Sequence, residues 1–167
     1  KLGNMWSDDI RPQHWNAMIE ACSNAFKEGA VGVVITHGTD TLAVSASAIS
    51  YGWSGNGGRP PGRIVLTGSQ RSSDRGSSDA GENLLASVYW AANGPSPNGG
   101  LGDSAVVMMH ANSDDGTIAV IPGCSARKLH STRRDAFQAV NSETLANVFV
   151  SRDGINHELQ TNYKNDM

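Results

Sequence analysis

Long apolar runs, cysteine-rich motifs and dense basic blocks are all missing from this sequence of 167 residues. No apolar stretch is long enough for a membrane-spanning helix, so we expect no membrane association. The two cysteines, Cys22 and Cys124, lie far apart and form no Cys-x-x-Cys pair, which favours a reducing, cytoplasmic compartment. The net charge of −3 and the lack of a Lys/Arg block argue against a purely electrostatic nucleic-acid surface.

Metal-ligand spacing is also missing. The five histidines stand at positions 14, 37, 110, 130 and 157, with no His-x-His or His-x-x-x-His pair among them. Such pairs are the usual sequence sign of a site built on one strand or helix. We therefore expect no metal site.

The composition that is present fits one globular α/β domain. Hydrophobic residues other than glycine make up 38% of the chain, and 19 glycines are added to them. This is far from a disordered composition, and the length suffices for a real core.

The stretch Val31 to Thr41, VGVVITHGTDT, organises the rest. Its β-branched apolar run does not alternate with polar residues, which predicts a strand buried on both faces in a parallel sheet. A helix is expected from Leu42 to Tyr51, so HGTDT occupies a strand-to-helix turn, where open α/β sheets place their ligands. Thr39 or Asp40 could instead simply cap the helix.

Further strands and helices alternate along the chain. This alternation predicts a three-layer α/β fold, with a mostly parallel sheet, right-handed crossovers and helices on both faces. We expect a helix from Pro12 to Gly29 capped by Ser7, Asp8 or Asp9, strands at 63–67, 105–110 and finally 147–150, a helix at 80–92 capped by Ser78 or Asp79, an apolar run at 117–121 and a turn at 153–154.

The sequence alone does not decide the role of two polar segments. In the loop 68–79, Arg71, Asp74, Arg75 and Asp79 could form a buried ion-pair network that shapes a site, or contact a substrate directly. The basic segment 126–137 could be a solvated loop with a few partner contacts.

At this point the motifs resemble a known family. THGTDT after a buried strand resembles the second threonine motif of the bacterial-type L-asparaginases, and TGSQRSSDRGSSDAGENL resembles the loop after their next strand. QRSSDRGSSDA, KLHSTRRDAF and NMWSDDIRPQHW are similar to the D-type subunits of archaeal glutamyl-tRNA(Gln) amidotransferases, which form one branch of this superfamily. The resemblance runs from about Asn4 to Val150 and implies an asparaginase-like N-terminal catalytic domain.

The resemblance also implies roles for particular residues. Thr39, Asp40 and Lys128 match a catalytic Thr-Lys-Asp cluster. Ser7 and Asp8 match positions that hold the α-carboxylate and α-amino group of the substrate, although Asp8 stands where simple asparaginases often carry Gln. The remaining assignments are His37 and Gly38 at the substrate, and a charged rim of Arg71, Asp74, Arg75, Arg133, Arg134 and Asp135 that could couple the site to a partner.

One family motif does not occur here. Nothing in the sequence resembles the Thr-Gly-Gly-Thr-Ile strand, which by resemblance supplies the nucleophilic threonine. We therefore expect residues 1–151 to be a catalytic domain lacking its first strand, residues 152–167 to begin a linker to a C-terminal domain, and the chain alone to be inactive.

The implied reaction is hydrolysis of glutamine or asparagine. The chemistry needs an activated hydroxyl and a site for the oxyanion, and a threonine hydroxyl needs a base. The ammonia would pass to an E-type partner subunit that uses ATP and Mg²⁺ to amidate tRNA-bound glutamate. This chain would bind no cofactor, would contact tRNA mainly through the partner, and would form a homodimer within a heterotetramer. The alternatives are a free L-asparaginase and a non-catalytic interaction domain on an amidase fold.

Overall fold

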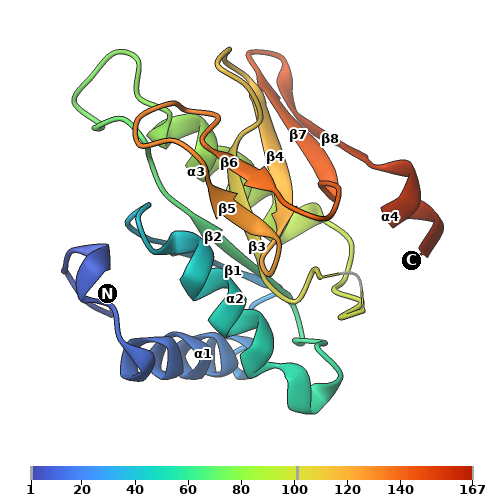
Figure 1. Cartoon of the computed structure of the whole chain (residues 1–167). Helices are drawn as coiled ribbons and strands as arrows, with labels where there is room; N and C mark the ends of the chain where they lie inside the picture. Colours follow the sequence, from blue (N-terminus) through green and yellow to red (C-terminus); the bar gives the residue numbers. More distant parts are fainter. Residues whose placement is uncertain (1, 101, 167) are drawn as a thin grey trace.

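A six-stranded β-sheet forms the centre of the computed structural model, which describes residues 2–100 and 102–166 (Figure 1). Its strands lie in the order β1–β2–β3–β4–β7–β8, and β5 and β6 form a separate two-stranded sheet. The strands are β1 Gly32–Thr36, β2 Arg63–Thr67, β3 Val106–His110, β4 Thr117–Pro122, β5 Ala126–Lys128, β6 Phe137–Ala139, β7 Ala146–Ser151 and β8 Gly154–Leu159.

Helices cover both faces of this sheet, as the alternation of elements predicted. One face carries α1 and α2, whereas α3 packs on the other (Figure 1). The helices are α1 Pro12–Lys27, α2 Leu42–Gly52, α3 Ala80–Asn93 and α4 Thr161–Asp166, with single 3₁₀ turns at η1 Ser7–Asp9 and η2 Ser54–Asn56. The α/β class and the three-layer arrangement are therefore confirmed.

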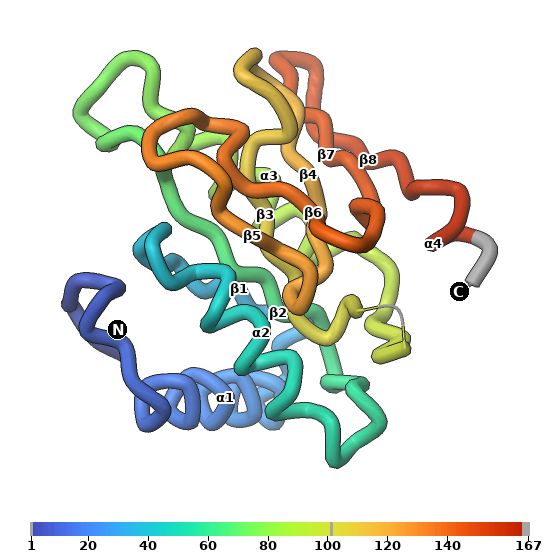
Figure 2. The backbone as a smooth tube through the Cα atoms, in the orientation of Figure 1, coloured from blue at the N-terminus to red at the C-terminus, as the bar shows by residue number. Residues whose placement is uncertain are grey.

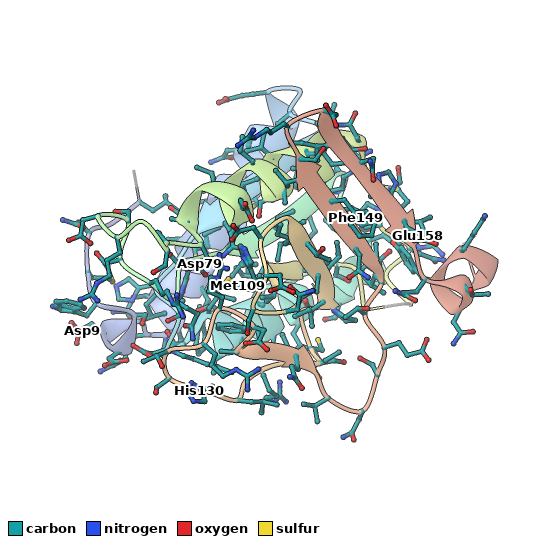
Figure 3. All side chains as sticks on the ribbon, turned by 90° about the horizontal axis from the view of Figure 1, so that it is seen from above. Asp9, Asp79, Met109, His130, Phe149 and Glu158 are labelled. Atoms are coloured by element: carbon teal, nitrogen blue, oxygen red, sulfur yellow. The ribbon has the colours of Figure 1, made fainter. Side chains whose placement is uncertain are left out.

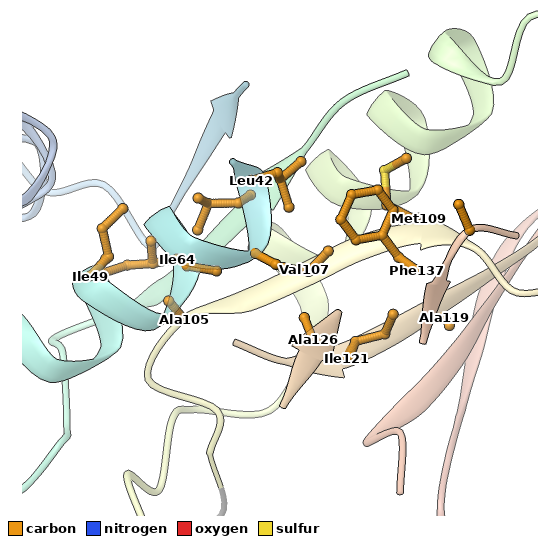
Figure 4. Close-up of a cluster of buried hydrophobic side chains, with 14 of the residues drawn as sticks. Leu42, Ile49, Ile64, Ala105, Val107, Met109, Ala119, Ile121, Ala126 and Phe137 are labelled. Carbon is orange, nitrogen blue, oxygen red and sulfur yellow. The ribbon is translucent and has the colours of Figure 1, made fainter. Parts of the chain in front are cut away.

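Two hydrophobic clusters hold these layers together. In the first, Leu42 and Ile49 of α2 pack on alternate residues of the central strands (Figure 4). Phe137 of β6 belongs to the same buried cluster. In the second, Trp90 of α3 packs on the opposite face with Val65 and Val106. Neighbouring strand residues thus serve opposite faces, which is why β2 and β3 are uninterrupted apolar runs.

The prediction of a mostly parallel sheet needs correction. Only the pairs β1–β2 and β2–β3 are parallel in the described part of the chain, and β3–β4, β4–β7 and β7–β8 are antiparallel. The segment 111–116 that joins β3 to β4 is too short for a crossover, so the chain must turn back on itself.

Strand β1 is also less buried than predicted. Its apolar residues are half-buried, whereas those of β2 and β3 are almost completely buried. The reason is position, because β1 lies at the edge of the described sheet and pairs only with β2. Its carboxyl end still lies beside that of β2, as the parallel register Thr36↔Thr67 requires.

The chain continues in regular structure beyond the strand expected to be last. Strand β8 pairs antiparallel with β7, and Tyr163 of α4 is 4% exposed in the second cluster. The Tyr163 hydroxyl donates to Asp103, which is itself buried. The compact body thus includes residues placed by sequence in a linker; Lys1, Leu101 and Met167 lie outside the described residues.

The cap of helix α1 differs from the prediction, whereas that of α3 falls at a predicted residue. Helix α1 is capped at Arg11, whose backbone N–H donates to His14 Nδ1, so none of Ser7, Asp8 and Asp9 caps it. Asp79 is the N-cap residue of α3, as predicted, but its carboxylate accepts no hydrogen bond from a backbone N–H of the first turn. The hydroxyl of Ser78, the other predicted cap, accepts from the Ala80 N–H at 3.2 Å.

The basic segment 126–137, for which a solvated loop was one interpretation, belongs to a β-hairpin that extends to residue 139. Strands β5 and β6 pair in the register Lys128↔Phe137 and lie over the sheet face that carries α2 (Figure 2). The connecting residues 129–136 are called the β5–β6 loop below. No described helix is long and apolar enough to cross a membrane.

Candidate active site

Lys128 joins the two residues that follow Gly38 in the HGTDT turn. Its Nζ donates to Thr39 Oγ1 at 2.9 Å and to Asp40 Oδ1 at 2.7 Å. The Lys128 side chain is 16% exposed and that of Asp40 is 64% exposed, so the cluster lies at the wall of an open site. Residues that are 89 positions apart in the sequence thus form one hydrogen-bonded group.

Neither Thr39 nor Asp40 caps helix α2. The N-cap of α2 is Thr41, and no side chain bonds to the first turn there. Both candidate oxygens instead accept hydrogen bonds from Lys128. Their catalytic role stays a prediction, but they are free for it.

Ser7 lies directly against the same turn. A Cβ on Gly38 would stand 2.7 Å from Ser7 Cβ and 2.8 Å from Ser7 Oγ, so only glycine fits this approach. The Thr41 hydroxyl donates to the Ser7 carbonyl at 2.8 Å, and Ser7 is 6% exposed. Asp8 is exposed one residue further on. Ser7 therefore borders the HGTDT turn, whereas the side chain of Asp8 is exposed and its predicted substrate contact stays a prediction.

His37 is buried beneath the turn. Its Nδ1 contacts the Gly38 carbonyl at 2.7 Å, so this nitrogen carries the proton and donates. Burial lowers the pKa of His37, against a smaller raising influence of the Gly38 carbonyl. Its Nε2 is buried without a partner in the described structure. His37 therefore supports the turn as a neutral ring.

An open pocket of about 800 Å³ lies beside these residues, at the carboxyl ends of β1 and β2. Its lining includes His37 and Gly38 from the first turn and Gly68, Ser69 and Arg71 from the loop after β2. The size is within the range of small-molecule sites, and the position is where open α/β sheets bind ligands. Thr39 adjoins it, because its Cγ2 would be 3.2 Å from a Cβ on Gly68.

The residues 68–79, called the β2–α3 loop, fold around the carboxylate of Asp79. This side chain is fully buried and accepts hydrogen bonds from Ser69 Oγ and from the backbone N–H groups of Gln70 and Arg71. Asn83 Nδ2 supplies a further donor at 3.0 Å. A carboxylate surrounded by donors in this way is a hub that fixes the loop.

The expected ion-pair network in this loop does not form. Arg71, Asp74 and Arg75 are exposed and make no ion pair with any described residue, and Asp79 is satisfied by neutral donors. Each of the three charges remains hydrated in solvent, which costs less than burying it in a pair.

The hydrogen-bond network around Asp79 extends through Asn83 to the buried His110. Asn83 Oδ1 contacts His110 Nδ1 at 2.8 Å, and His110 Nε2 contacts Glu82 Oε2 at 3.0 Å. Burial lowers the pKa of His110 and Arg134 lowers it further, whereas Glu82 and Asp79 raise it. The residues Asn83, Glu82 and His110 gave no sequence signal of this role, because the contacts join three different elements.

Arg133 and Arg134 both form ion pairs, the first within the β5–β6 loop and the second with the β3–β4 connection. Arg133 forms an ion pair with Asp135, and Arg134 binds Asp115 at 2.6 Å. These contacts lower the pKa of Asp135 and Asp115 and raise that of Arg133. The predicted rim thus exists as two separate ion pairs on one side of the site and free charges on the other.

Potential metal ligands do meet once in the described structure. The ligand atoms of Glu82, His110 and Asp115 lie within 4.8 Å of one another. Arg134 already binds the Asp115 carboxylate, and Glu82 already accepts from the Gly116 N–H and contacts His110. These contacts satisfy the group without an ion, so the arrangement itself does not require one.

Figure 3 shows where the two polar loops lie in the molecule. Asp79 and His130, which mark the β2–α3 and β5–β6 loops, lie on the side away from Phe149 and Glu158 of β7 and β8. The polar loops thus gather at one edge of the sheet, around the Lys128 contacts.

Fold and site together define an α/β domain of amidohydrolase type, with a Thr–Asp–Lys cluster at the carboxyl ends of parallel strands. The chain belongs to the asparaginase family: the family model described as "Asparaginase, N-terminal" matches residues 1–163.

Curated relatives indicate which branch of the family this chain resembles. The D-type subunit of the glutamyl-tRNA(Gln) amidotransferase from Metallosphaera sedula is 44% identical over 147 residues, which cover 88% of this chain and 31% of that protein. The same subunit from Saccharolobus islandicus is 46% identical with the same coverage. The resemblance to the D-type branch is therefore confirmed, and the chain spans about a third of the length of these relatives.

Solved structures agree on the fold. The thermostable L-asparaginase from Thermococcus kodakarensis superposes with a TM-score of 0.70 at 31% identity, covering 94% of this chain and 42% of that one. L-asparaginase I from Vibrio cholerae gives a TM-score of 0.68 at 29% identity, covering 95% and 41%.

Proposed function

We propose that the polypeptide containing this domain is the amidohydrolase subunit of a glutamyl-tRNA(Gln) amidotransferase. It hydrolyses glutamine or asparagine and delivers the ammonia to an E-type partner subunit. The observation that carries the proposal is the pair of hydrogen bonds from Lys128 Nζ to Thr39 Oγ1 and Asp40 Oδ1. The likeness to the D-type subunits of two archaeal amidotransferases supports this branch of the family.

The geometry suits a shared proton relay. Lys128 Nζ donates to Thr39 Oγ1, so the Thr39 hydroxyl hydrogen is left for a second acceptor such as a substrate or another hydroxyl. Asp40 orients the amine from its other side and, being exposed, can also meet the ammonium group of an amino-acid substrate. Loss of a proton from Lys128 would make it the acceptor for Thr39, which is how such a relay activates a hydroxyl.

The nucleophile is expected from a Thr-Gly-Gly-Thr-Ile segment, which this sequence does not contain. Strand β1 has one unpaired edge in the described sheet. A groove of about 360 Å³ runs beside it, lined by Val33 and Ile35 of β1 and by Met18 and Cys22 of α1. An added parallel strand would end beside Thr39, because β1 itself ends at Thr36.

The partners and cofactors belong to the same proposal. The E-type subunit uses ATP and Mg²⁺ to activate and amidate tRNA-bound glutamate in the cytoplasm, and it contacts most of the tRNA. The net charge of −3 on this chain supports the assignment of most tRNA contacts to the partner. The assembly is a homodimer of this subunit within a heterotetramer.

The test compares glutamine and asparagine hydrolysis by the full-length polypeptide with its partner, with and without Glu-tRNA(Gln) and ATP-Mg²⁺. We expect strong stimulation by the charged tRNA, because an amidotransferase couples its two sites. Arg133→Ala should weaken this stimulation without abolishing the basal rate, since Arg133 is an exposed member of the rim. Arg152→Ala is the matched control, because Arg152 is exposed at the distant β7–β8 turn.

A full basal rate that ignores both tRNA and partner would instead identify a free L-asparaginase, the activity named for the Thermococcus structure. Absence of any amide hydrolysis, even in the complete assembly, would leave a non-catalytic domain on this fold.

A further inference from the structure

One side chain ties the two loops that border the candidate site. Gln70 lies in the β2–α3 loop, and its Nε2 donates to the carbonyls of His130 at 3.2 Å and Arg133 at 3.0 Å. Both acceptors belong to the β5–β6 loop, sixty or more positions away in the sequence. Gln70 lies within the motif QRSSDRGSSDA, but the sequence assigned no role to it.

Within the described residues, all hydrogen bonds between these two loops come from Gln70. No ion pair joins the loops there either, because Arg133 and Arg134 pair with Asp135 and Asp115. The position of one loop relative to the other therefore depends on this amide.

The Gln70 end of the tie is rigid. The Gln70 backbone N–H donates to both carboxylate oxygens of Asp79, at 3.1 and 3.0 Å, and Asp79 is fully buried. Asn83 anchors Asp79 in turn to α3. A side chain that starts from such a fixed backbone can transmit position to whatever it binds.

The orientation of the amide is also fixed. Rotating it by half a turn would place Oε1 against two carbonyl oxygens, so both Nε2 hydrogens must face the β5–β6 loop. In this orientation Oε1 is buried without a partner. A buried acceptor left unpaired is unfavourable, so the fold keeps this tie at the expense of another hydrogen bond.

The far end of the tie is close to Lys128. Lys128 is the last residue of β5, a strand of three residues, and His130 follows two positions later. Leu129 N–H donates to the Ala136 carbonyl and closes the hairpin, so the loop and the strand end move together. A shift of the loop would carry Lys128 away from Thr39.

We propose that Gln70 is a positioning residue that holds the β5–β6 loop and thereby sets Lys128 against Thr39 and Asp40. The catalytic meaning of this role rests on the proposed function, whereas the structural tie does not. Gln70 itself touches neither Thr39 nor Lys128 through any hydrogen bond in the described chain.

The experiment uses the full-length polypeptide in its amidotransferase assembly, with Gln70→Met and Gln70→Glu. Both variants keep the length of the side chain and remove its two donors. We expect kcat for glutamine hydrolysis to fall about 10- to 100-fold, because small misplacements of a catalytic group have effects of that size. KM should stay within about twofold, since the bound substrate does not contact Gln70 in this scheme. Ser77→Ala is the matched control, because Ser77 is exposed in the same loop.

Hydrogen exchange supplies a readout that does not need activity. Amides of residues 128–136 should exchange faster in both Gln70 variants and not in the control, while those of β2 and α3 stay protected. Unchanged exchange at 128–136, or a rise that spreads equally to β2 and α3, would overturn the proposal. So would a retained kcat, or a loss confined to KM. A wild-type assembly without amide hydrolysis would defeat the proposed function alone, and the exchange result would still decide the role of Gln70.

Discussion

The buried carboxylate of Asp79 gives the most direct test of how the candidate site is held. We consider Asp79→Asn, which keeps the shape of the side chain and replaces one oxygen by an NH₂ group. The remaining oxygen can still accept from Ser69, Gln70 and Arg71 on the loop side. The new NH₂ group then faces Asn83 Nδ2 and the Gln70 backbone N–H, each 3.0 Å from Asp79 Oδ2 in the wild-type chain.

Asn83 cannot relieve this contact by turning its own amide. Its Nδ2 also donates to the Gly68 carbonyl, and its Oδ1 faces His110 Nδ1. The variant thus loses the hydrogen bond from Asn83 and the Oδ2 half of the shared bond from Gln70, and it leaves a buried donor unsatisfied. We expect the free energy of unfolding to fall by about 3 kcal/mol. Domains of this size are stabilised by only about 5–15 kcal/mol in total, so the loss is large.

Urea unfolding followed by circular dichroism measures this difference at neutral pH. The control is Asp74→Asn, an exposed position in the same loop, where we expect a change within about 0.5 kcal/mol. An Asp79→Asn variant as stable as the control would refute the reasoning, because it would mean that water satisfies Asn83 and that the carboxylate is not the hub of the loop.

Two further predictions concern the HGTDT turn and its neighbour. In the full-length polypeptide, Thr39→Val, Asp40→Asn and Lys128→Met should each lower amide hydrolysis about 10²- to 10⁴-fold. Steady-state kinetics of the double variants should show little further loss, because members of one relay are not additive, and multiplying losses would assign them separate roles. Burial places the pKa of His37 below its ordinary 6.5, so the unfolded chain takes up the proton first, and stability should fall as the pH drops below 6.5. His37→Asn retains an N–H for the Gly38 carbonyl and cannot titrate; equal pH dependence of unfolding in wild type and variant would contradict this account.

The elements nearest the site were the easiest to predict from sequence. Strands β1 and β2 are apolar, β-branched runs that end abruptly at polar turns, and both lie where predicted. Their parallel pairing brings the HGTDT turn and the β2–α3 loop to one edge. The approach of Lys128 to this edge came from family resemblance, because no local pattern links residues 89 positions apart.

The direction of the later strands was harder to predict. An uninterrupted apolar run such as β4 has the same pattern in a parallel and an antiparallel pairing. The length of segment 111–116 carried the missing signal, since a parallel crossover needs a dozen or more residues. Strand β8 was missed because its sequence, GINHEL, is largely polar and its residues alternate between exposed and half-buried.

The supporting contacts of the site could not be predicted at all. Asp79 was expected to cap a helix or join an ion pair, and it does neither through its carboxylate. Its partners are backbone N–H groups presented by a loop whose shape exists only in the folded chain. The same holds for Gln70, whose acceptors are two backbone carbonyls.

The distance along the chain between Thr39 and Lys128 has a consequence for the order of folding. Contacts that close long stretches of chain are slow to form, because the entropy of the intervening chain is lost before the contact compensates for it. The β1–β2 pair, the β3–β4 hairpin and their helices join segments much closer in sequence. The sheet can thus assemble while the β5–β6 hairpin is still undocked, and the domain can acquire its shape before Lys128 reaches Thr39 and Asp40. On the proposed function, a nascent chain of this kind acquires no amidohydrolase chemistry until the β5–β6 hairpin has docked.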